Sequence, residues 1–353
     1  MIEVNLQNFY SGKKIFLTGH TGFKGAWLSM WLSMMGAKVC GFSLAEEKES
    51  LFNILEIDSK LEKSTFGDIR KFDELQKSVT EFQPEIIIHM AAQSLVRPSY
   101  SDPRATYETN LIGTLNVFEA ARKCQNVRAI LNITTDKCYE NRETNHNYRE
   151  DDALGGYDPY SASKACAEIL TSSHRRSFLT QSGIYLASAR AGNVIGGGDF
   201  SADRIIPDIF RSIREGKKVT LRSPNAIRPW QHVLEPLHGY LLLTKNLYEK
   251  KEIFAQAYNF GPDSDAEQNV EILTKNFIEK IGVGGYEAKP DNNFHEAGIL
   301  KLDNSRAKKE LGWKPKLSFE ENLEWTANWY KSYLDKGDMK KFTEHQIENF
   351  TQK

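Results

Sequence analysis

Short apolar runs alternate with amphipathic stretches along the first half of the chain. The apolar runs predict buried parallel strands. They cover Lys14–Thr18, Lys38–Phe42, Ser64–Phe66, Pro84–Gln93, Val127–Ile133 and a run from Tyr185. The stretches between them predict helices over Ala26–Gly36, Lys71–Phe82, Tyr107–Lys123 and Tyr160–Phe178. Strands and helices that alternate in this way predict an α/β fold with a doubly wound parallel sheet.

A glycine-rich segment joins the first predicted strand to the first long helix. Its sequence is GHTGFKG, with Gly19, Gly22 and Gly25. Strand, glycine turn and helix form the context of a dinucleotide-binding fingerprint, in which the turn approaches a pyrophosphate and the helix N-terminus meets its charge. A tight turn without a ligand is the alternative. The next strand ends in Ser43 where an acid would hold the adenosine ribose, and Lys24 is a nearby cation, so NAD and NADP both remain open.

A hydroxyl, a carboxylic acid and an amine stand side by side after the strand that ends at Ile133. They are Thr135, Asp136 and Lys137. Further along, Tyr160 and Lys164 are four residues apart and therefore share one face of a helix. A lysine beside a tyrosine lowers the pKa of the phenol and makes it a usable general base. Taken alone, this pair is weak, because a solvated lysine beside a core tyrosine gives the same pattern.

The candidate groups all fall at predicted strand ends. Ligands of doubly wound sheets bind at the carboxyl ends of strands. The glycine turn, the small residues Ala91 and Ala92, the segment from Thr135 to Lys137, and Asn193 all lie at such ends. Their agreement is stronger evidence for a cofactor site than any single motif.

These groups suffice for a three-step reaction on a sugar. Tyr160 removes a hydroxyl proton as hydride leaves the same carbon, with Thr135 bonded to that hydroxyl and Lys164 holding the phenolate and the nicotinamide ribose. Oxidation acidifies the neighbouring C–H bond, so an acid and a base can then remove water. Asp136 is predicted to protonate the departing 6-hydroxyl and Lys137 to take the C5 proton, after which hydride returns to C6.

Six segments together resemble the nucleotide-sugar 4,6-dehydratases of the extended short-chain dehydrogenase/reductase superfamily. They are GHTGFKG, HMAAQ, TTDKCY, YSASK, RAGNVIGGGD and RPWQHV, and the resemblance covers nearly the whole chain. Within these enzymes Thr-Asp-Lys resembles the members that act on CDP-glucose, whereas Thr-Asp-Glu is typical of those that use dTDP- or GDP-sugars. The resemblance implies a hydro-lyase that uses NAD rather than NADP and acts on CDP-glucose for surface polysaccharide (O-antigen) synthesis.

The resemblance also assigns roles to individual residues. Asp68 would reach the adenine, although a helix N-cap is the alternative. Asn193 and Arg228 would hold the diphosphate, because guanidinium pairs with phosphate, and Arg204 either does likewise or is an ordinary surface residue. The expected cofactor-binding residues are Gly19, Gly22, Phe23, Lys24, Gly25, Ser43, Asp68, Ile69, Ala91, Ala92, Thr134, Tyr160 and Lys164. The expected substrate-binding residues are Gln93, Asn193, Arg204, Arg228 and Trp230.

The regular alternation loosens after residue 190. We therefore expect a Rossmann domain over residues 1–190, which carries the catalytic residues, and a smaller α/β lobe over 191–353 that binds the nucleotide sugar. Some segments of the second part are expected to return to the first. A helix is predicted within Asp203–Lys217 after its proline and another from Phe319, and the charged segment Gly337–Lys353 is expected to be peripheral.

Composition narrows the function classes. The chain has 353 residues, and Lys+Arg 46 against Asp+Glu 47 gives a net charge of −1, so nucleic acid is not an expected partner. The sequence contains no apolar run of about 18 residues, which predicts no membrane span. The four cysteines form no CxxC pair, the histidines lack ligand spacing, and the N-terminus lacks a signal pattern, so we expect a cytoplasmic protein without a metal site.

Two other functions remain open at this stage. A nucleotide-sugar epimerase would need only Thr135, Tyr160 and Lys164, and a dehydratase for another nucleotide sugar would use the same catalytic set. A non-catalytic dinucleotide sensor would need none of these groups. By analogy with the superfamily, helices Tyr107–Lys123 and Tyr160–Phe178 are expected to build a homodimer through a four-helix interface.

Overall fold

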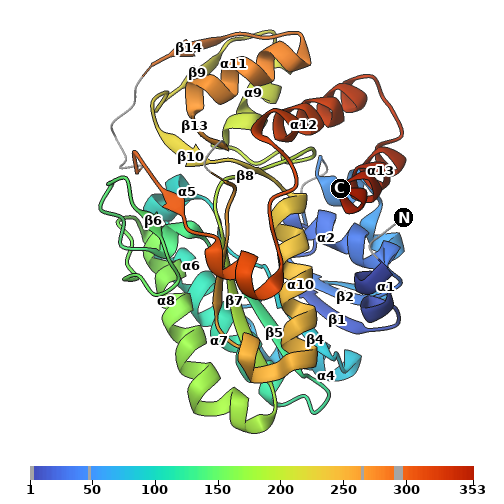
Figure 1. Ribbon diagram of the computed structural model, residues 1–353. Coiled ribbons are helices and arrows are strands. Elements are labelled where there is room, and N and C mark those ends of the chain that lie inside the picture. The colour runs from blue at the N-terminus through green and yellow to red at the C-terminus, as the bar shows by residue number, and fades with distance from the viewer. Residues whose placement is uncertain (1–3, 47–48, 264–265, 290–296) are drawn as a thin grey trace.

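A seven-stranded parallel sheet forms the centre of the molecule (Figure 1). The computed structural model describes residues 4–46, 49–263, 266–289 and 297–353. In spatial order the strands of this sheet are β12 (Ala257–Phe260), β7 (Tyr185–Ala191), β5 (Ala129–Ile133), β4 (Ile86–His89), β1 (Lys14–Thr18), β2 (Lys38–Ser43) and β3 (Lys63–Phe66). Every neighbouring pair is parallel, which confirms the predicted doubly wound α/β fold.

Successive residues of the central strands face opposite sides of the sheet and enter two separate cores. In β1, Ile15 and Leu17 join the larger core, whereas Phe16 joins the smaller one. Helices α1 (Val4–Tyr10), α2 (Phe23–Met34) and α10 (Leu234–Lys250) contribute to the larger core. Helices α4 (Phe72–Phe82) and α7 (Gly113–Arg122) contribute to the smaller one. Because both faces are covered, the central strands β1, β4 and β5 are mainly apolar, whereas the edge strand β3, KSTF, is polar and partly exposed.

Most predicted elements lie where the sequence placed them. The strand Lys14–Thr18 matches β1, and the predicted helix Tyr160–Phe178 corresponds to α8 (Pro159–His174) with the π-helical turn η4 (Arg175–Leu179). The predicted strand Pro84–Gln93 is longer than the observed β4. The shorter helical elements of this half are α3 (Leu51–Ile54), η1 (Ile57–Lys60), α5 (Val96–Ser101), α6 (Pro103–Tyr107), η2 (Glu108–Ile112), η3 (Asp136–Cys138) and η5 (Thr180–Ser182).

A second, smaller lobe lies beyond the carboxyl ends of the sheet, at the top of Figure 1. Its helices are α9 (Ile205–Arg214) and α11 (Val270–Ile281). Short strands pair two by two: β9 (Val219–Leu221) with β14 (Tyr286–Ala288), β10 (Ile227–Pro229) with β13 (Glu267–Asn269), β8 (Val194–Ile195) with β11 (Gln231–His232), and β6 (Asn147–Tyr148) with β15 (Lys301–Leu302). Helix α9 contains Pro207 in its first turn, where proline is tolerated.

Segments beyond residue 190 also belong to the central sheet and its cover. Strand β12 pairs with β7, and α10 with η6 (Lys251–Phe254) follows one face of the sheet. The turn η8 (Ala307–Leu311) lies against α10 and β12. The division of the chain at residue 190 stays a prediction.

The last helix corrects the expectation for the end of the chain. After α12 (Phe319–Leu334), residues Met339–Gln352 form α13, in which Ile347 and Phe350 are fully buried. Helix α13 contacts α12 and α2, and Phe350 meets Trp31 edge to face. The expectation of a peripheral segment was therefore wrong, because the frequent charges lie on one side of an amphipathic helix whose other side is apolar.

Candidate active site

A cleft opens at the carboxyl ends of β1, β4, β5 and β7, between the sheet and the second lobe. Many of the residues singled out from the sequence line it. They are Phe23, Lys24, Thr134, Thr135, Asp136, Lys137, Tyr160, Asn193, Arg204, Arg228 and Trp230. The structure therefore brings predicted cofactor, catalytic and substrate residues into one cleft.

The glycine turn after β1 has the geometry that a dinucleotide diphosphate requires. Gly19 has φ 77°, and a Cβ there would lie 2.7 Å from the backbone nitrogen of Ala91. A Cβ on Gly25 would lie 1.9 Å from the carbonyl oxygen of Gly19. Gly22 is the N-cap of α2 and provides no side-chain cap. The first N–H groups of the helix can therefore bind an anion.

The ends of β2 and β3 carry the residues predicted at the adenosine end. The Oγ atoms of Ser43 and Thr21 are 2.8 Å apart. The carboxylate of Asp68 accepts hydrogen bonds from the guanidinium of Arg70, and this interaction lowers the pKa of Asp68. Helix α4 has Lys71 at its N-cap, so Asp68 is not that cap. Ile69 is buried at the same edge, and contact of Asp68 with an adenine stays a prediction.

The segment after β5 forms a short 3₁₀ turn that presents the catalytic groups. Thr135 caps this turn: its Oγ1 accepts from the backbone N–H of Lys137 at 3.3 Å and donates to Oδ1 of Asp136 at 3.0 Å. Asp136 is buried, and its Oδ2 has no hydrogen-bond partner among the described residues. Burial raises the pKa of Asp136, against the opposing charge of Lys137. Asp136 is therefore suited to hold a proton that it can donate.

Tyr160 and Lys164 lie on the first turns of α8, which Asp158 caps by accepting from the N–H of Ser161 at 3.0 Å. Burial raises the pKa of Tyr160 to about 12, although a hydrogen bond with Thr135 lowers it in part. Lys164 is buried and donates from Nζ to the carbonyl oxygen of Ile133 at 3.2 Å. Burial lowers the pKa of Lys164 to about 8, so its charge is retained near neutral pH.

Lys24 follows the glycine turn and reaches the same place. Burial lowers its pKa to about 7, and the charges of Arg204 and Lys164 act in the same direction, whereas Asp136 opposes them. Its Nζ lies 5.8 Å from the centre of the Tyr240 ring. The cation that left NADP open in the sequence therefore lies with the catalytic groups rather than at the end of β2, where the adenosine ribose is expected.

The predicted substrate residues come from both lobes. Arg204 donates to Oδ2 of Asp199 at 2.9 Å and to Oγ of Ser94 at 3.1 Å. Arg228 is 5% exposed on β10 and donates to the carbonyl oxygen of Ile227 at 2.9 Å. The Oδ1 atom of Asn193 is buried and has no partner among the described residues. Guanidinium groups fit a diphosphate, and Asn193 could contribute only through its amide N–H, because Oδ1 is an acceptor.

Trp230 and Gln93 have mainly structural contacts. The indole N–H of Trp230 donates to the carbonyl oxygen of Gln268 at 2.8 Å, although the residue lines the cleft. Gln93 does not line the cleft. Its side chain accepts from the N–H of Leu95 at 2.6 Å and donates to Oγ1 of Thr106 at 3.1 Å. The structure thus places Gln93 as a support for the loop after β4. The loop begins at Ala91 and Ala92, and the N–H of Ala91 donates to Oγ1 of Thr18 at 3.2 Å.

One cluster at the cleft was not expected from the sequence. Asp203 has φ 61° and accepts from Nη1 of Arg222 at 2.5 Å, and Nε of Arg97 lies 4.0 Å from the same carboxylate. All three residues line the cleft. They come from α5, the loop before α9 and the loop after β9, so no local pattern in the sequence could have joined them.

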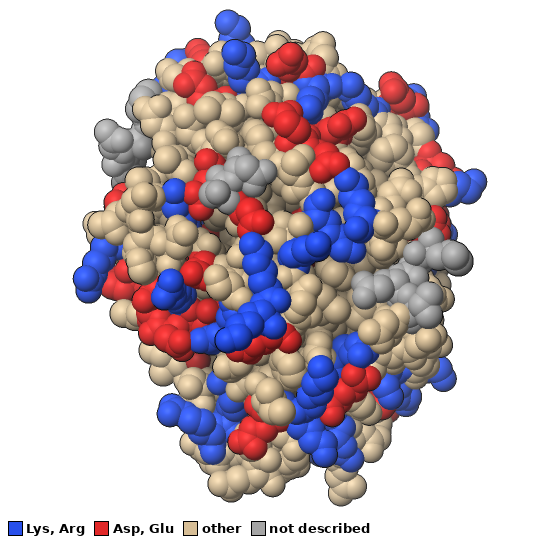
Figure 2. Space-filling view, in the orientation of Figure 1, with Lys and Arg blue, Asp and Glu red and all other residues tan. Residues whose placement is uncertain are grey.

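The described parts of the chain contain no group of three or more His, Cys, Asp or Glu side chains arranged to hold a metal ion. Within those same parts, no helix has the length and apolar character needed to cross a bilayer. Over the face shown in Figure 2, lysine and arginine side chains are interspersed with acidic ones. This mixture agrees with the small net charge of the chain.

Comparisons with known proteins identify a family for this chain and other proteins that share its fold. The profile of the GDP-mannose 4,6-dehydratase family matches residues 16–326. CDP-glucose 4,6-dehydratase of Salmonella typhimurium is 46% identical over 351 residues, with 98% of each chain covered. The fold is shared with dTDP-glucose 4,6-dehydratase of Streptomyces venezuelae, solved with NAD, at a TM-score of 0.78, 22% identity, and coverage of 92% of this chain and 98% of that one. It is also shared with an epimerase of Methanothermobacter thermautotrophicus at a TM-score of 0.80, 21% identity, and coverage of 96% and 97%.

Proposed function

Because the chain belongs to the GDP-mannose 4,6-dehydratase family, we propose that it dehydrates CDP-glucose to CDP-4-dehydro-6-deoxyglucose with NAD as its cofactor. The observation that carries this proposal is the segment after β5. It brings Thr135, a buried Asp136 and Lys137 into one cleft with Tyr160. An epimerase has no need of the acid and the amine. The relative that is 46% identical is a CDP-glucose 4,6-dehydratase, which supports CDP-glucose over other sugar nucleotides.

The cofactor would lie along the carboxyl edge of the sheet. The backbone turn at Gly19 and the N-terminus of α2 would hold its diphosphate, and Lys164 would hold the nicotinamide ribose. Bound NAD supplies reversible hydride acceptance. A side chain at Gly19 would meet the backbone of Met90 and Ala91, so the glycine turn lies directly against the backbone after β4.

The side chains of the cleft divide the proton transfers among them. Tyr160 takes the proton of the C4 hydroxyl, which Thr135 orients through its own hydroxyl. Oxidation at C4 acidifies the C5 proton, and Lys137 removes it. Asp136 donates its proton to the 6-hydroxyl, which leaves as water, so a C5–C6 double bond forms. When hydride is returned to C6, Lys137 gives a proton back to C5, which completes the 4-keto-6-deoxy sugar. The buried, unpartnered Oδ2 of Asp136 is the reason to assign this residue as the acid.

The substrate would span the two lobes. Arg228 of the second lobe and Arg204 at the start of α9 would neutralise the diphosphate, with Asn193 as an additional donor. The sugar would then extend toward Thr135 and Tyr160. Binding through groups of both lobes would fix C4 next to the catalytic residues.

We also propose that the protein is a cytoplasmic homodimer that contributes to polysaccharide synthesis. All four thiols are free, as expected in a reducing compartment. The expected interface helices carry exposed apolar side chains, with Ile169 59%, Ile112 44% and Phe178 41% exposed. Replacing Ile169 with lysine should shift the sedimentation of the protein from dimer to monomer. Unchanged sedimentation would place the interface elsewhere.

One assay separates the candidate reactions. The protein is incubated with CDP-glucose and a catalytic amount of NAD, and the product is analysed by mass spectrometry. We expect loss of one water, a base-labile 4-keto-6-deoxy sugar and no net accumulation of NADH. A product of unchanged mass would indicate an epimerase, and a stoichiometric rise of NADH would indicate a simple dehydrogenase. Parallel incubations with dTDP-, UDP- and GDP-sugars test the nucleotide preference.

A further inference from the structure

We propose that Glu168 is a positioning residue for this reaction, which fastens the catalytic strand end to helix α8 and places a negative charge next to Lys164. Glu168 does not line the cleft and touches none of the groups predicted to meet the sugar. It lies one helical turn beyond Lys164, which itself lies one turn beyond Tyr160. The inference rests on the proposed function for the role of Lys164 and Tyr160, but its physical test does not require substrate.

The carboxylate of Glu168 joins three elements inside the protein. Its Oε1 accepts a hydrogen bond from the hydroxyl of Thr134, directly after β5. Its Oε2 accepts from Oγ of Ser188 at 2.8 Å and from Nη2 of Arg190 at 2.8 Å, both on β7. The side chains of Glu168 and Arg190 are 3% and 4% exposed. Helix α8 is thereby bonded to the ends of two neighbouring strands.

This contact fixes the relation between the two halves of the catalytic set. Thr134 precedes the residues that present the hydroxyl, acid and amine, whereas α8 carries the base. Lys164 makes a parallel connection through its bond to the carbonyl oxygen of Ile133. Two adjacent residues of the strand end are therefore bonded to two successive turns of one helix. A third bond, from Nδ2 of Asn132 to Oγ1 of Thr171 at 2.8 Å, joins the same strand to the same helix. Loss of the Glu168 bond would remove the attachment at Thr134, directly before the catalytic turn.

Glu168 also acts on the charge of Lys164. Burial favours neutral Lys164, and the negative charge of Glu168 is the largest influence that opposes it. A Lys164 that loses its charge can no longer stabilise the phenolate of Tyr160. The other titratable or charged groups around this pair are Lys24 on α2, His89 on β4, Cys138 on η3, Arg190 on β7 and Arg175 at the end of α8.

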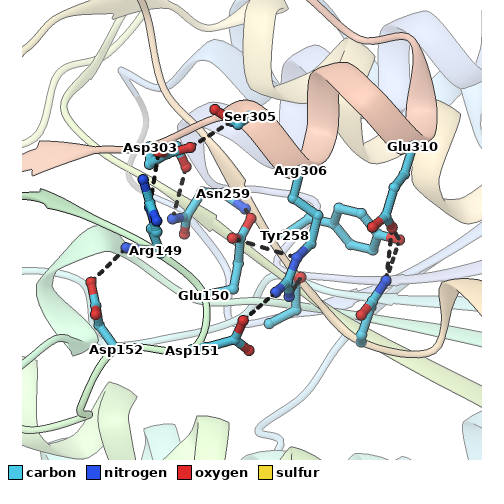
Figure 3. Close-up of polar contacts among 12 residues, drawn as sticks. Arg149, Glu150, Asp151, Asp152, Tyr258, Asn259, Asp303, Ser305, Arg306 and Glu310 are labelled. Carbon is cyan, nitrogen blue, oxygen red and sulfur yellow. Dashed lines mark hydrogen bonds and ion pairs between the residues drawn. The ribbon is translucent and has the colours of Figure 1, made fainter.

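The Glu168–Arg190 ion pair continues into a polar network that reaches Asp303 and Arg306. Nη1 of Arg190 donates to Oη of Tyr139 at 2.9 Å, and Tyr139 donates to Oδ1 of Asn259 at 2.6 Å. Figure 3 shows the next contacts, in which Asn259 meets Glu150 and the segment at Asp303. The same close-up shows Arg306 with Glu150 and Asp151. The segment with Asp303 and Arg306 is therefore connected, through this network, to the strands β5 and β7 that Glu168 joins.

The alternative is that the buried ion pair of Glu168 and Arg190 only stabilises the fold. Its removal would then lower stability and activity without moving any ionisation near the active site. The two explanations predict different results for the pKa of Lys164. That pKa depends on Glu168 only if Glu168 has the positioning role.

The test uses Glu168→Gln, which keeps the shape and one acceptor but removes the charge. The protein is labelled with nitrogen-15 lysine, and the Lys164 signal is identified by its absence in Lys164→Arg. We expect the midpoint of Lys164 titration to fall by about 1 pH unit or more relative to the wild type, as for the loss of a nearby opposite charge. We also expect kcat for CDP-glucose to fall at least ~10-fold above about pH 8, with a much smaller change in KM.

Ser188→Ala is the matched control. It removes another hydrogen bond to the same carboxylate but leaves the charge and the bond from Thr134 in place. Its Lys164 midpoint and pH profile should match the wild type. If Glu168→Gln does not fold, Glu168→Gln with Arg190→Met removes both members of the Glu168–Arg190 pair. It should lower the midpoint by a smaller amount, because the positive charge of Arg190 is lost as well. An unchanged midpoint in the folded variant overturns the proposal. Wild-type protein without turnover of CDP-glucose would instead overturn the proposed function.

Discussion

Replacing Tyr160 with phenylalanine tests the first chemical step. The change removes one oxygen and keeps the ring on α8. In the structure the pKa of Tyr160 is about 12, so at about pH 8 only ~10⁻⁴ of the phenol is ionised unless neighbouring cations act on it. A side chain used as a general base contributes about 10²–10⁴-fold, which corresponds to about 2.7–5.5 kcal/mol of activation free energy. We expect a loss of the first step within that range.

The assay follows reduced nicotinamide in a single turnover after enzyme, NAD and CDP-glucose are mixed. The wild-type rate should rise with pH toward about 8, because Tyr160 acts as the phenolate and its pKa lies above the working range. Above that pH the rate should level or fall, because the pKa of Lys164 is about 8 and its charge is lost there. The Tyr160→Phe variant should be much slower than the wild type, and its rate should not rise with pH.

Tyr157→Phe is the matched control. It makes the same chemical change three residues earlier, on a side chain that is 78% exposed and outside the cleft. Its rate should stay within about two-fold of the wild type, as is usual for an exposed site. If Tyr160→Phe retained activity within a few-fold, or kept the rising limb, Tyr160 would not be the base.

Three further changes address other parts of the structure. Lys137→Met should permit oxidation at C4 but block elimination, so NADH builds up on the enzyme and solvent deuterium no longer enters C5; normal incorporation would show that another group takes the proton. Gly25→Ala should weaken NAD binding at least ~100-fold in a fluorescence titration, because its Cβ would lie 1.9 Å from an oxygen of Gly19, whereas Gly22→Ala, at 3.5 Å, should cost much less. Burial raises the pKa of Glu235 from 4.5 to about 7, so stability falls as the pH rises from about 4.5 to about 7, and above that pH the full loss is on the order of 3 kcal/mol. Glu235→Gln should therefore raise Tm relative to the wild type more at pH 8 than at pH 5, and an equal difference at both would contradict the assignment.

Local patterns were sufficient for much of the fold and for the centre of the site. The bounds of the strand Lys14–Thr18 could be predicted because the apolar residues follow two lysines and the run ends directly before Gly19. The segment from Thr135 to Lys137 could be placed at a strand end because the preceding run is apolar on both faces. These features depend only on residues that are close together in the sequence, so the sequence alone was sufficient to predict them.

Contacts between distant segments could not be read in the same way. Gln93 follows a strand end just as Ala91 and Ala92 do, but its amide turns to Leu95 and Thr106, a choice set by the fold of the loop. No sequence pattern near Asp203 predicts that Arg222 and Arg97 lie beside its carboxylate. The last helix was misjudged for a different reason: Met339, Ile347 and Phe350 lie at helical spacing in the sequence, but the charged residues between them dominate the composition.

The same burial has opposite consequences for the two acids of the site. Removing water from Asp136 and Tyr160 raises the pKa of both. This helps Asp136, which must carry a proton to the leaving hydroxyl, and it hinders Tyr160, which must lose one. The site therefore needs positive charge directed at the phenol, and Arg204 lowers the pKa of Tyr160 while Lys164 lies one turn away on the same helix. The cluster of cations around a buried tyrosine is thus required by the placement of the acid beside it, and one cleft can hold a proton donor and a base at the same pH.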